Sequence, residues 1–356
     1  MTRLIEKLRN NPFVPFLTKK VLFMLLAIFV VMSLIFIIPR LMPRSPVDLM
    51  IDQVTGSQTT LGSGSAPSGQ GAVQALKEVY IEKFGINKPL TTQYVDFWER
   101  FFTMDFGVSY WQYPTPVSGL IAYSLPWTMA LIIPVVPLGF VVGNWIGSRS
   151  AYYRGRLDNL LYYFSMYLFR APYYWFALVF LLVFGYYLGA FPLSGAYSPL
   201  TYERPIMSFD WFVDALQHFA LPFLSLVGIG VGGWAVGMRA MTVYEMESDY
   251  ITYSKQLGFS KDKLRQYAER NAILPNFTWI PITFKTLISQ TLLVEVVFGY
   301  PGLGYLAYHG VMAQDYPLIQ ACFAISILIV LIGNFIADLM YGKLDPRIGS
   351  GYVSKG

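Results

Sequence analysis

The sequence has 356 residues, of which 55% are hydrophobic and 13% are charged, and its formal net charge is +5. Soluble domains carry roughly 25% charged residues, so this composition argues against a soluble domain and indicates a protein of the lipid bilayer. Lys and Arg stand in short clusters between apolar runs, a pattern that argues against a nucleic-acid partner. Cys322 is the single cysteine, which excludes a disulfide framework and a Cys-rich metal site.

Six apolar runs are long enough to cross a bilayer, because a helix of about 20 residues spans the ~30 Å hydrocarbon core. In chain order they cover residues 21–39, 127–146, 157–188, 219–238, 276–298 and 318–337. The third run is longer than the core, so it requires tilt or an extension along the interface. No small-residue cleavage pattern follows the first run, which we therefore interpret as a retained span. The prediction is an all-α integral membrane protein with about six transmembrane helices.

Lys and Arg in the short loops predict which side is cytoplasmic. They gather in the N-terminal segment, between runs two and three, and between runs four and five. The segment between runs five and six contains neither, and the one between three and four contains only Arg204. We therefore expect a multi-pass protein of the cell membrane, with residues 1–20 and the tail 346–356 in the cytoplasm.

The first span, 21–42, is followed by an extracytoplasmic segment, 43–125, that is too long for a plain connection and is expected to be partly folded. Its Gly/Ser-rich insert, 56–72, is typical of a flexible linker. Helical spacing after the insert predicts a short helix, which either contacts an outside partner or covers the span ends. Residues 126–345 form the predicted transmembrane domain of five spans, with a cytoplasmic loop at 245–275.

Within that loop, residues 249–275 are predicted to form two short helices. Gly258 fits the left-handed conformation that ends a helix, and Ser260 fits the cap of the next one. One face of the first helix is predicted to hold Tyr250, Tyr253, Ser254 and Leu257. A helix-turn-helix on the membrane surface suits a cytoplasmic partner, whereas an amphipathic anchor for the loop is the alternative.

The loop resembles the cytoplasmic loop of ABC importer permeases, in which a short helix is followed by Gly and, about a dozen residues later, by Leu-Pro. Gly258 and Leu274-Pro275 occupy those places. The version here is most similar to the dipeptide/oligopeptide permease family, some of whose members carry oligosaccharides. Further matching motifs are PVSGLI after Thr115, AFPLSG at 190–195, VEVVFGYPGLG at 294–304, QDYPLIQ at 314–320 and LDPRI at 344–348.

The resemblance implies a permease that pairs with a second homologous permease, two cytoplasmic ATPase subunits and an extracytoplasmic solute-binding protein. It assigns ATPase coupling to Asp249, Tyr250, Tyr253, Ser254, Leu257, Gly258, Phe259, Ser260, Arg270, Asn271, Leu274 and Pro275. Tyr253-Ser254-Lys255 stands where the wider superfamily has Glu-Ala-Ala, so the acidic first position is absent. Peptides and oligosaccharides are the expected substrates, and nickel or another small solute is the alternative.

No phosphate-binding Gly-Lys-Ser/Thr loop occurs in the sequence, so no cofactor is expected in this chain, and ATP and Mg²⁺ are expected in partner subunits. The Gly-rich run 228–237 lies within a span, where small residues let helices approach closely. Without a catalytic cluster or a filter sequence, a membrane enzyme and a channel are less favoured than a permease.

Arg170 and Lys285 are costly in hydrocarbon, so both are expected to face protein or water, and with Glu295 they are the candidate residues of the solute pathway. Pairing with a carboxylate such as Glu295, or a Lys285 side chain that reaches the headgroups, is the structural alternative. His218 and His309 lack partners at metal-ligand spacing, so no metal site is expected. Asn276 heads an Asn-Phe-Thr glycosylation pattern, but it falls at the inner membrane edge, where glycosylation is not expected.

Overall fold

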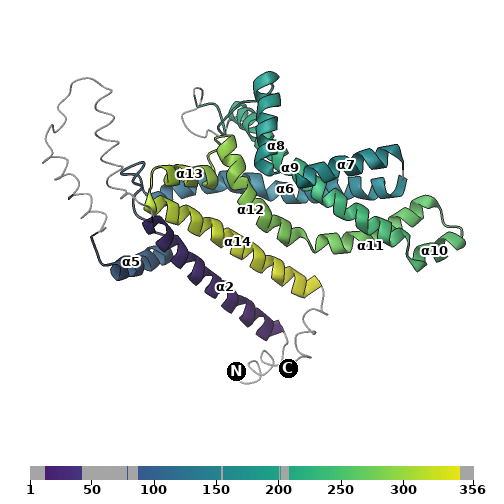
Figure 1. Cartoon of the computed structure of the whole chain (residues 1–356), viewed down its shortest axis with the longest axis horizontal. Coiled ribbons are helices and arrows are strands. Elements are labelled where there is room, and N and C mark those ends of the chain that lie inside the picture. Colours follow the sequence, from purple (N-terminus) through teal and green to yellow (C-terminus); the bar gives the residue numbers. More distant parts are fainter. Residues whose placement is uncertain are drawn as a thin grey trace. The chain divides into compact units, whose positions relative to one another are not determined.

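The computed structural model describes residues 13–41, 78, 87–153, 155–199, 201 and 208–344, and these residues are predominantly helical (Figure 1). The helices are α2 (Phe13–Ile37), η1 (Ile38–Leu41), α5 (Leu90–Thr103), α6 (Val117–Tyr153), α7 (Arg156–Arg170), α8 (Tyr173–Phe180), η2 (Leu181–Tyr187), α9 (Phe209–Met246), α10 (Asp249–Gln256), α11 (Lys261–Phe277), α12 (Ile280–Val297), α13 (Leu303–Met312) and α14 (Tyr316–Leu344). Within the same ranges, β pairing is limited to an isolated bridge between Val108 and Pro116. The predicted all-α fold is confirmed.

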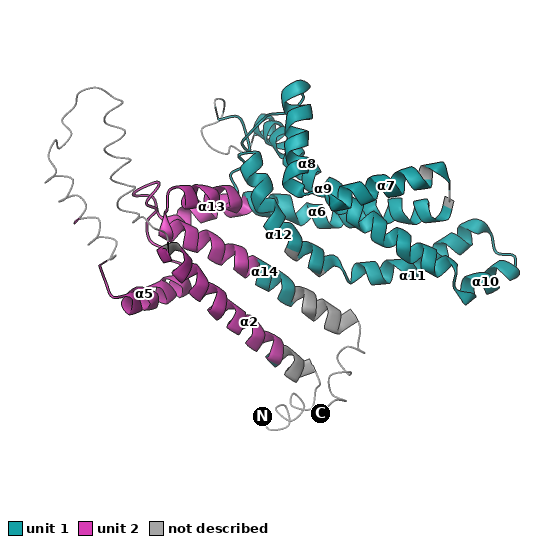
Figure 2. Cartoon of the chain, viewed as in Figure 1, with its two compact units in different colours: residues 1–18, 127–302, 330–356 teal, residues 19–126, 303–329 magenta. Residues whose placement is uncertain are grey.

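The chain divides into two compact units (Figure 2). Unit 1 comprises residues 1–18, 127–302 and 330–356, and unit 2 comprises residues 19–126 and 303–329. Helices α6 and α14 each begin in unit 2 and continue into unit 1. The loop that the sequence assigns to coupling lies entirely in unit 1.

Four helices are long and apolar enough to cross a membrane, and up to six spans result if each of two bent helix pairs counts as one span. The four are Thr18–Ile37, Val117–Tyr152, Phe209–Met246 and Tyr316–Phe335. One bent pair is Asp158–Arg170 with Tyr173–Tyr187, which meet at 108°, and the other is Lys261–Phe277 with Ile282–Val297, which meet at 52°. The prediction of six spans therefore agrees with the structure when each bent pair is counted as one span.

The third predicted run, 157–188, is not one straight helix, because it bends sharply after Arg170. Helix α7 ends at Arg170, where Ala171 takes an extended conformation with φ −69° and ψ 135°. Pro172 follows Ala171, and the ring of a proline disfavours helical backbone in the residue before it. Arg170 thus stands at the end of α7, beside the sharp turn between the two helices of this bent pair.

Glycines set the packing distances between the long helices of unit 1. A Cβ added to Gly232 of α9 would lie 2.7 Å from both the Ser165 carbonyl oxygen and the Leu168 Cβ of α7. On α6, a Cβ added to Gly147 would clash with the Ala235 carbonyl oxygen of α9, and one added to Gly143 would clash with the Trp234 side chain. The close helix approach expected for the Gly-rich run is confirmed.

An ion pair joins the first turn of α7 to the C-terminal part of α9. The Arg239 guanidinium donates from Nε to Asp158 Oδ1 at 3.1 Å and from Nη2 to Asp158 Oδ2 at 3.2 Å. Its Cζ also lies 4.2 Å from the centre of the Tyr162 ring. A bidentate contact of this kind fixes orientation as well as distance, so it holds α7 in register against α9.

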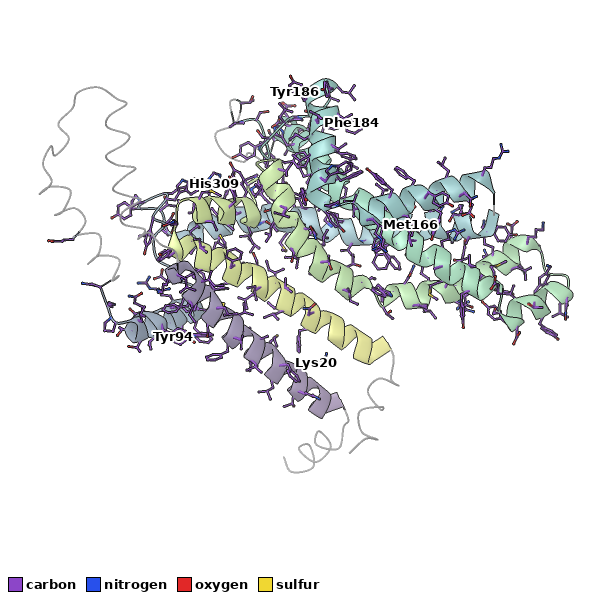
Figure 3. All side chains as sticks on the ribbon, viewed as in Figure 1. Lys20, Tyr94, Met166, Phe184, Tyr186 and His309 are labelled. Atoms are coloured by element: carbon purple, nitrogen blue, oxygen red, sulfur yellow. The ribbon has the colours of Figure 1, made fainter. Side chains whose placement is uncertain are left out.

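The segment between the first two predicted spans is partly folded, and its described part includes α5 in unit 2. Arg40 donates from Nη2 to Gln93 Oε1 at 2.9 Å, and its guanidinium lies 3.5 Å from the centre of the Phe36 ring. Tyr94, labelled in Figure 3, shares a 2.7 Å hydrogen bond with Ser33 of α2. These contacts attach α5 to the C-terminal half of α2 and to η1. The Gly/Ser-rich insert lies outside the described residues.

Unit 2 also contains a buried carboxylate at the start of α14. Asp315 is fully buried, accepts a hydrogen bond from the Leu318 amide at 3.1 Å and caps the helix. The Ser109 hydroxyl and the Trp111 amide donate to its other oxygen at 2.5 and 3.0 Å. Asp315 therefore fixes the loop before α6 against the N-terminus of α14.

Two Gly-to-Ala substitutions on α9 test whether glycine spacing sets the packing. Gly232→Ala should destabilise the protein by about 1–3 kcal/mol, because the added methyl overlaps α7. Gly230→Ala, the control on the same helix, has nothing within 4 Å of its new Cβ and should leave stability unchanged or slightly higher. Thermal unfolding in detergent measures both, and equal melting temperatures for the two variants would contradict the assignment.

Candidate coupling loop

Helices α10 and α11 form the loop and are joined by four residues, Leu257 to Ser260. The Phe259 amide donates to the Ser254 carbonyl at 3.2 Å, and the Gly258 amide donates to the Lys255 carbonyl at 3.1 Å. This pair of hydrogen bonds is the Schellman arrangement, which satisfies the last carbonyls of a helix and turns the chain away. The predicted helix stop at Gly258 is confirmed.

Gly258 has the left-handed backbone that the turn requires, with φ +82°. A Cβ built there meets nothing within 4 Å. The need for glycine at this position is therefore conformational and not steric, because L side chains disfavour this region of φ even where space is open.

The Ser260 prediction is correct in position and wrong in its side-chain contact. Ser260 is the N-cap residue of α11, but its side chain makes no capping hydrogen bond. The first helical turn instead forms through the backbone, where the Leu264 amide donates to the Ser260 carbonyl at 3.1 Å. Asp262 stands in the first turn as expected, where a carboxylate favours the positive end of the helix dipole.

A small hydrophobic core holds the two loop helices together. Ile251 of α10 packs with Leu264 and Ala268 of α11, and Met246 and Tyr250 cover them. Ile251 was absent from the face predicted for α10, because the prediction followed the aromatic residues rather than the single buried aliphatic one. The two helices therefore share a core of their own.

The apolar side chains around the tip point away from that core. Tyr253 and Leu257 are 63% and 58% exposed, and Phe259 is 40% exposed. The Phe259 and Tyr267 rings meet edge to face, with centroids 6.1 Å apart, so the tip has defined side-chain packing. Arg270, Asn271, Leu274 and Pro275 are also exposed, along α11.

Tyr250 connects α10 to the end of α9. Its hydroxyl donates to Glu245 Oε2 at 2.6 Å. Burial, together with this bond to the carboxylate, raises the pKa of Tyr250, while hydrogen bonds with Asn271 and Ser248 oppose the shift. The phenol thus stays protonated and keeps its donor role toward Glu245.

The structure does not bring the proposed pathway residues into one described cluster. Arg170 is exposed, with its guanidinium 5.4 Å from the centre of the Phe169 ring. Lys285 belongs to α12, but its side chain lies outside the described residues. Glu295 is fully buried and accepts a hydrogen bond from the Thr128 hydroxyl of α6 at 2.7 Å. The predicted Glu295 pairing with Arg170 or Lys285 stays a prediction.

The sequence does not predict a buried amide pair that joins α11 to α6 in unit 1. Asn276 Nδ2 of α11 donates to Asn144 Oδ1 of α6 at 2.7 Å. Asn276 is 4% exposed, which agrees with its rejection as a glycosylation site. No local pattern points to this pair, because the partners are 132 residues apart in the chain.

A family model described as the binding-protein-dependent transport system inner membrane component matches residues 136–350, more than half of the chain. The match contains α10, Gly258, α11 and α12. The chain belongs to this family. It is a permease subunit of the ABC importer class, and the prediction that it is not itself an enzyme is confirmed by the family.

Individual relatives of this permease cover nearly its whole length. The oligopeptide transport system permease protein AppB of Bacillus subtilis is 31% identical over 88% of this chain and 92% of its own length. The oligopeptide permease protein OppB of Haemophilus influenzae is 28% identical over 94% of this chain and 98% of its own. The dipeptide permease protein DppB of Lactococcus lactis is 27% identical over 94% of this chain and 99% of its own length. The predicted resemblance to the dipeptide/oligopeptide permeases is confirmed.

Proposed function

We propose that this permease forms half of a translocation pathway for peptides and is coupled to cytoplasmic ATPase subunits through the loop of α10 and α11. A second, homologous permease would supply the other half, and an extracytoplasmic binding protein would deliver the solute. ATP and Mg²⁺ would bind to the ATPase partners. The observation that carries the coupling role is the loop itself, a compact helix pair with an exposed apolar tip.

The exposed tip fits a protein partner better than a mere connection between spans. Tyr253, Leu257 and Phe259 are exposed on a turn held by two backbone hydrogen bonds, while the aliphatic core lies on the other side of the helices. Exposed apolar side chains on an ordered element mark contact surfaces. The alternative, insertion of this tip into the membrane interface, is separated from coupling by the Gly258 variants below.

Peptides are the proposed substrate because the three relatives described above are named for oligopeptide or dipeptide transport. Oligosaccharides and nickel have no such support among these names. Arg170, Lys285 and Glu295 stay proposed pathway residues, although full burial and the Thr128 contact favour a structural role for Glu295.

Cysteine labelling tests the proposed orientation, with both termini in the cytoplasm. Glu99 on α5 and Lys263 on α11 both have exposed side chains. In a Cys322→Ala background, Glu99→Cys should therefore react with a membrane-impermeant maleimide from outside intact cells. Lys263→Cys on α11 should react only after the membrane is opened. Reaction of both positions from the same side would contradict the topology.

Thermal unfolding of the partner binding protein tests the substrate class. Short peptides should raise its melting temperature, because a ligand that binds only the folded state stabilises it by mass action. At a peptide concentration of about 100 times Kd the gain is about 2.7 kcal/mol. Stabilisation by oligosaccharides and not by peptides would overturn the peptide assignment and leave the permease role intact.

Two substitutions at Gly258 test the coupling role. Gly258→Val should abolish stimulation of ATPase by the loaded binding protein in the reconstituted importer, because a β-branched residue is strongly disfavoured at φ +82°. Gly258→Asn should retain stimulation, since Asn tolerates the left-handed conformation and the space around the Cβ is open.

The measurement is the ATPase rate with and without binding protein, at matched amounts of assembled complex. Because both substitutions add a side chain of similar size at a site without neighbours, the comparison isolates backbone conformation. Normal stimulation in the Gly258→Val complex would refute the loop as the coupling element and favour the membrane-anchor alternative.

A further inference from the structure

Helix α11 extends without interruption from the tip of the loop to the membrane helices. Its buried residues repeat every fourth position, and they are Leu264, Ala268, Ala272 and Asn276. The first two belong to the core shared with α10, and the last meets α6. At 1.5 Å per residue, the 17 residues of α11 span about 25 Å. One helix therefore carries both the loop core and the contact with α6.

The contact between α11 and α6 is a chain of two hydrogen bonds. Asn276 Nδ2 donates to Asn144 Oδ1 at 2.7 Å, and Asn144 Nδ2 donates to the Phe140 carbonyl one turn earlier, also at 2.7 Å. Both asparagines are at most 5% exposed. The Phe140 and Phe277 rings meet edge to face at 5.9 Å, beside the amide pair.

Helix α9 closes the third side of this junction. A Cβ added to Gly237 would lie 3.0 Å from Asn276 Oδ1, so the α9 backbone lies close to the Asn276 amide. The Trp234 ring of α9 packs against the Phe140 ring at 5.1 Å. The amides are thus enclosed by apolar rings and glycine, where separation would leave buried polar groups unpaired at a cost of about 1–3 kcal/mol.

Helix α6 extends the connection toward the other end of unit 1. Thr128, 16 residues before Asn144 and about 24 Å away along the helix, donates to the buried Glu295 of α12. A displacement of α6 at Asn144 would consequently reach the C-terminal end of α12, where Glu295 lies. The described contacts therefore form a continuous path from the loop tip through α11 and α6 to α12.

We propose that Asn144 and Asn276 are positioning residues for coupling: their hydrogen bond makes α6 follow α11 when the ATPase subunits move the loop. The inference rests on the proposed coupling function of α10 and α11. It adds a specific place where loop motion enters the membrane helices. Neither residue contacts the solute or the ATPase in this role, and both act through the helices they join.

The test replaces both amides by a side chain of similar size that cannot hydrogen bond. Asn144→Leu with Asn276→Leu removes the link without leaving one amide buried alone, so this double variant should assemble even where a single variant does not. Thr291→Val is the matched control, because Thr291 is fully buried and its hydroxyl donates within α12, to the Leu287 carbonyl at 2.8 Å.

Two readouts separate coupling from stability in the complete importer. The first is the stimulation of ATPase by binding protein with a pool of short peptides, which should fall about fivefold or more in the double variant, in the range of ordinary coupling energies. The second is the distance between spin labels at Lys263 of α11 and Val141 of α6, both exposed positions. That distance should stay constant on ATP binding in the parental complex and shift in the double variant.

The control and the Gly258→Val complex decide between the possible failures. Thr291→Val should retain parental stimulation and a constant label distance. Parental behaviour of the double variant, together with lost stimulation in Gly258→Val, would overturn the Asn144–Asn276 link alone. Parental stimulation in Gly258→Val would overturn the coupling loop, and the link would fall with it.

Discussion

The close approach of α9 to α6 and α7 fixes the other features of unit 1. Lipid tails are as apolar as the helix surfaces, so hydrophobic burial does not drive helices together in a bilayer, and contact has to come from packing. Gly143, Gly147 and Gly232 provide it by removing side chains where the backbones meet. Since α9 ends at Met246, with two residues between it and Asp249, its placement also determines where the loop begins.

Apolar run length predicted the spans well and their internal breaks poorly. Counting apolar residues treats 157–188 as one segment, whereas Pro172 forces Ala171 out of the helix and turns the chain by 108°. At Pro275 the opposite occurs, because α11 continues through the proline to Phe277. Tertiary contacts of Asn276 and Phe277 hold that last turn in place, and such contacts leave no signal in a run of apolar letters.

Prediction of the loop succeeded where a single residue type determines backbone shape. Gly258 was identifiable because few residues adopt its conformation and because helical spacing ends there. The buried face was harder to identify, since Tyr and Leu suit either a core or a contact surface, and here Ile251 is buried while Tyr253 and Leu257 are exposed. The pairing of Asn144 with Asn276 depends on three helices meeting, so the fold had to be known first.

The attachment of α5 to the first span has a further consequence for how unit 2 moves. Phe29 with Trp98 and Ser33 with Tyr94 are contacts one turn apart on α2, and Arg40 of η1 contacts Gln93 about two turns further on; the Phe29 and Trp98 rings stack with centroids 5.8 Å apart. One contact would act as a pivot, but three along an axis prevent rolling of one helix on the other. Helix α5 therefore moves with the first span as one rigid element, so the orientation of α5 reports the rotation of that span in the bilayer.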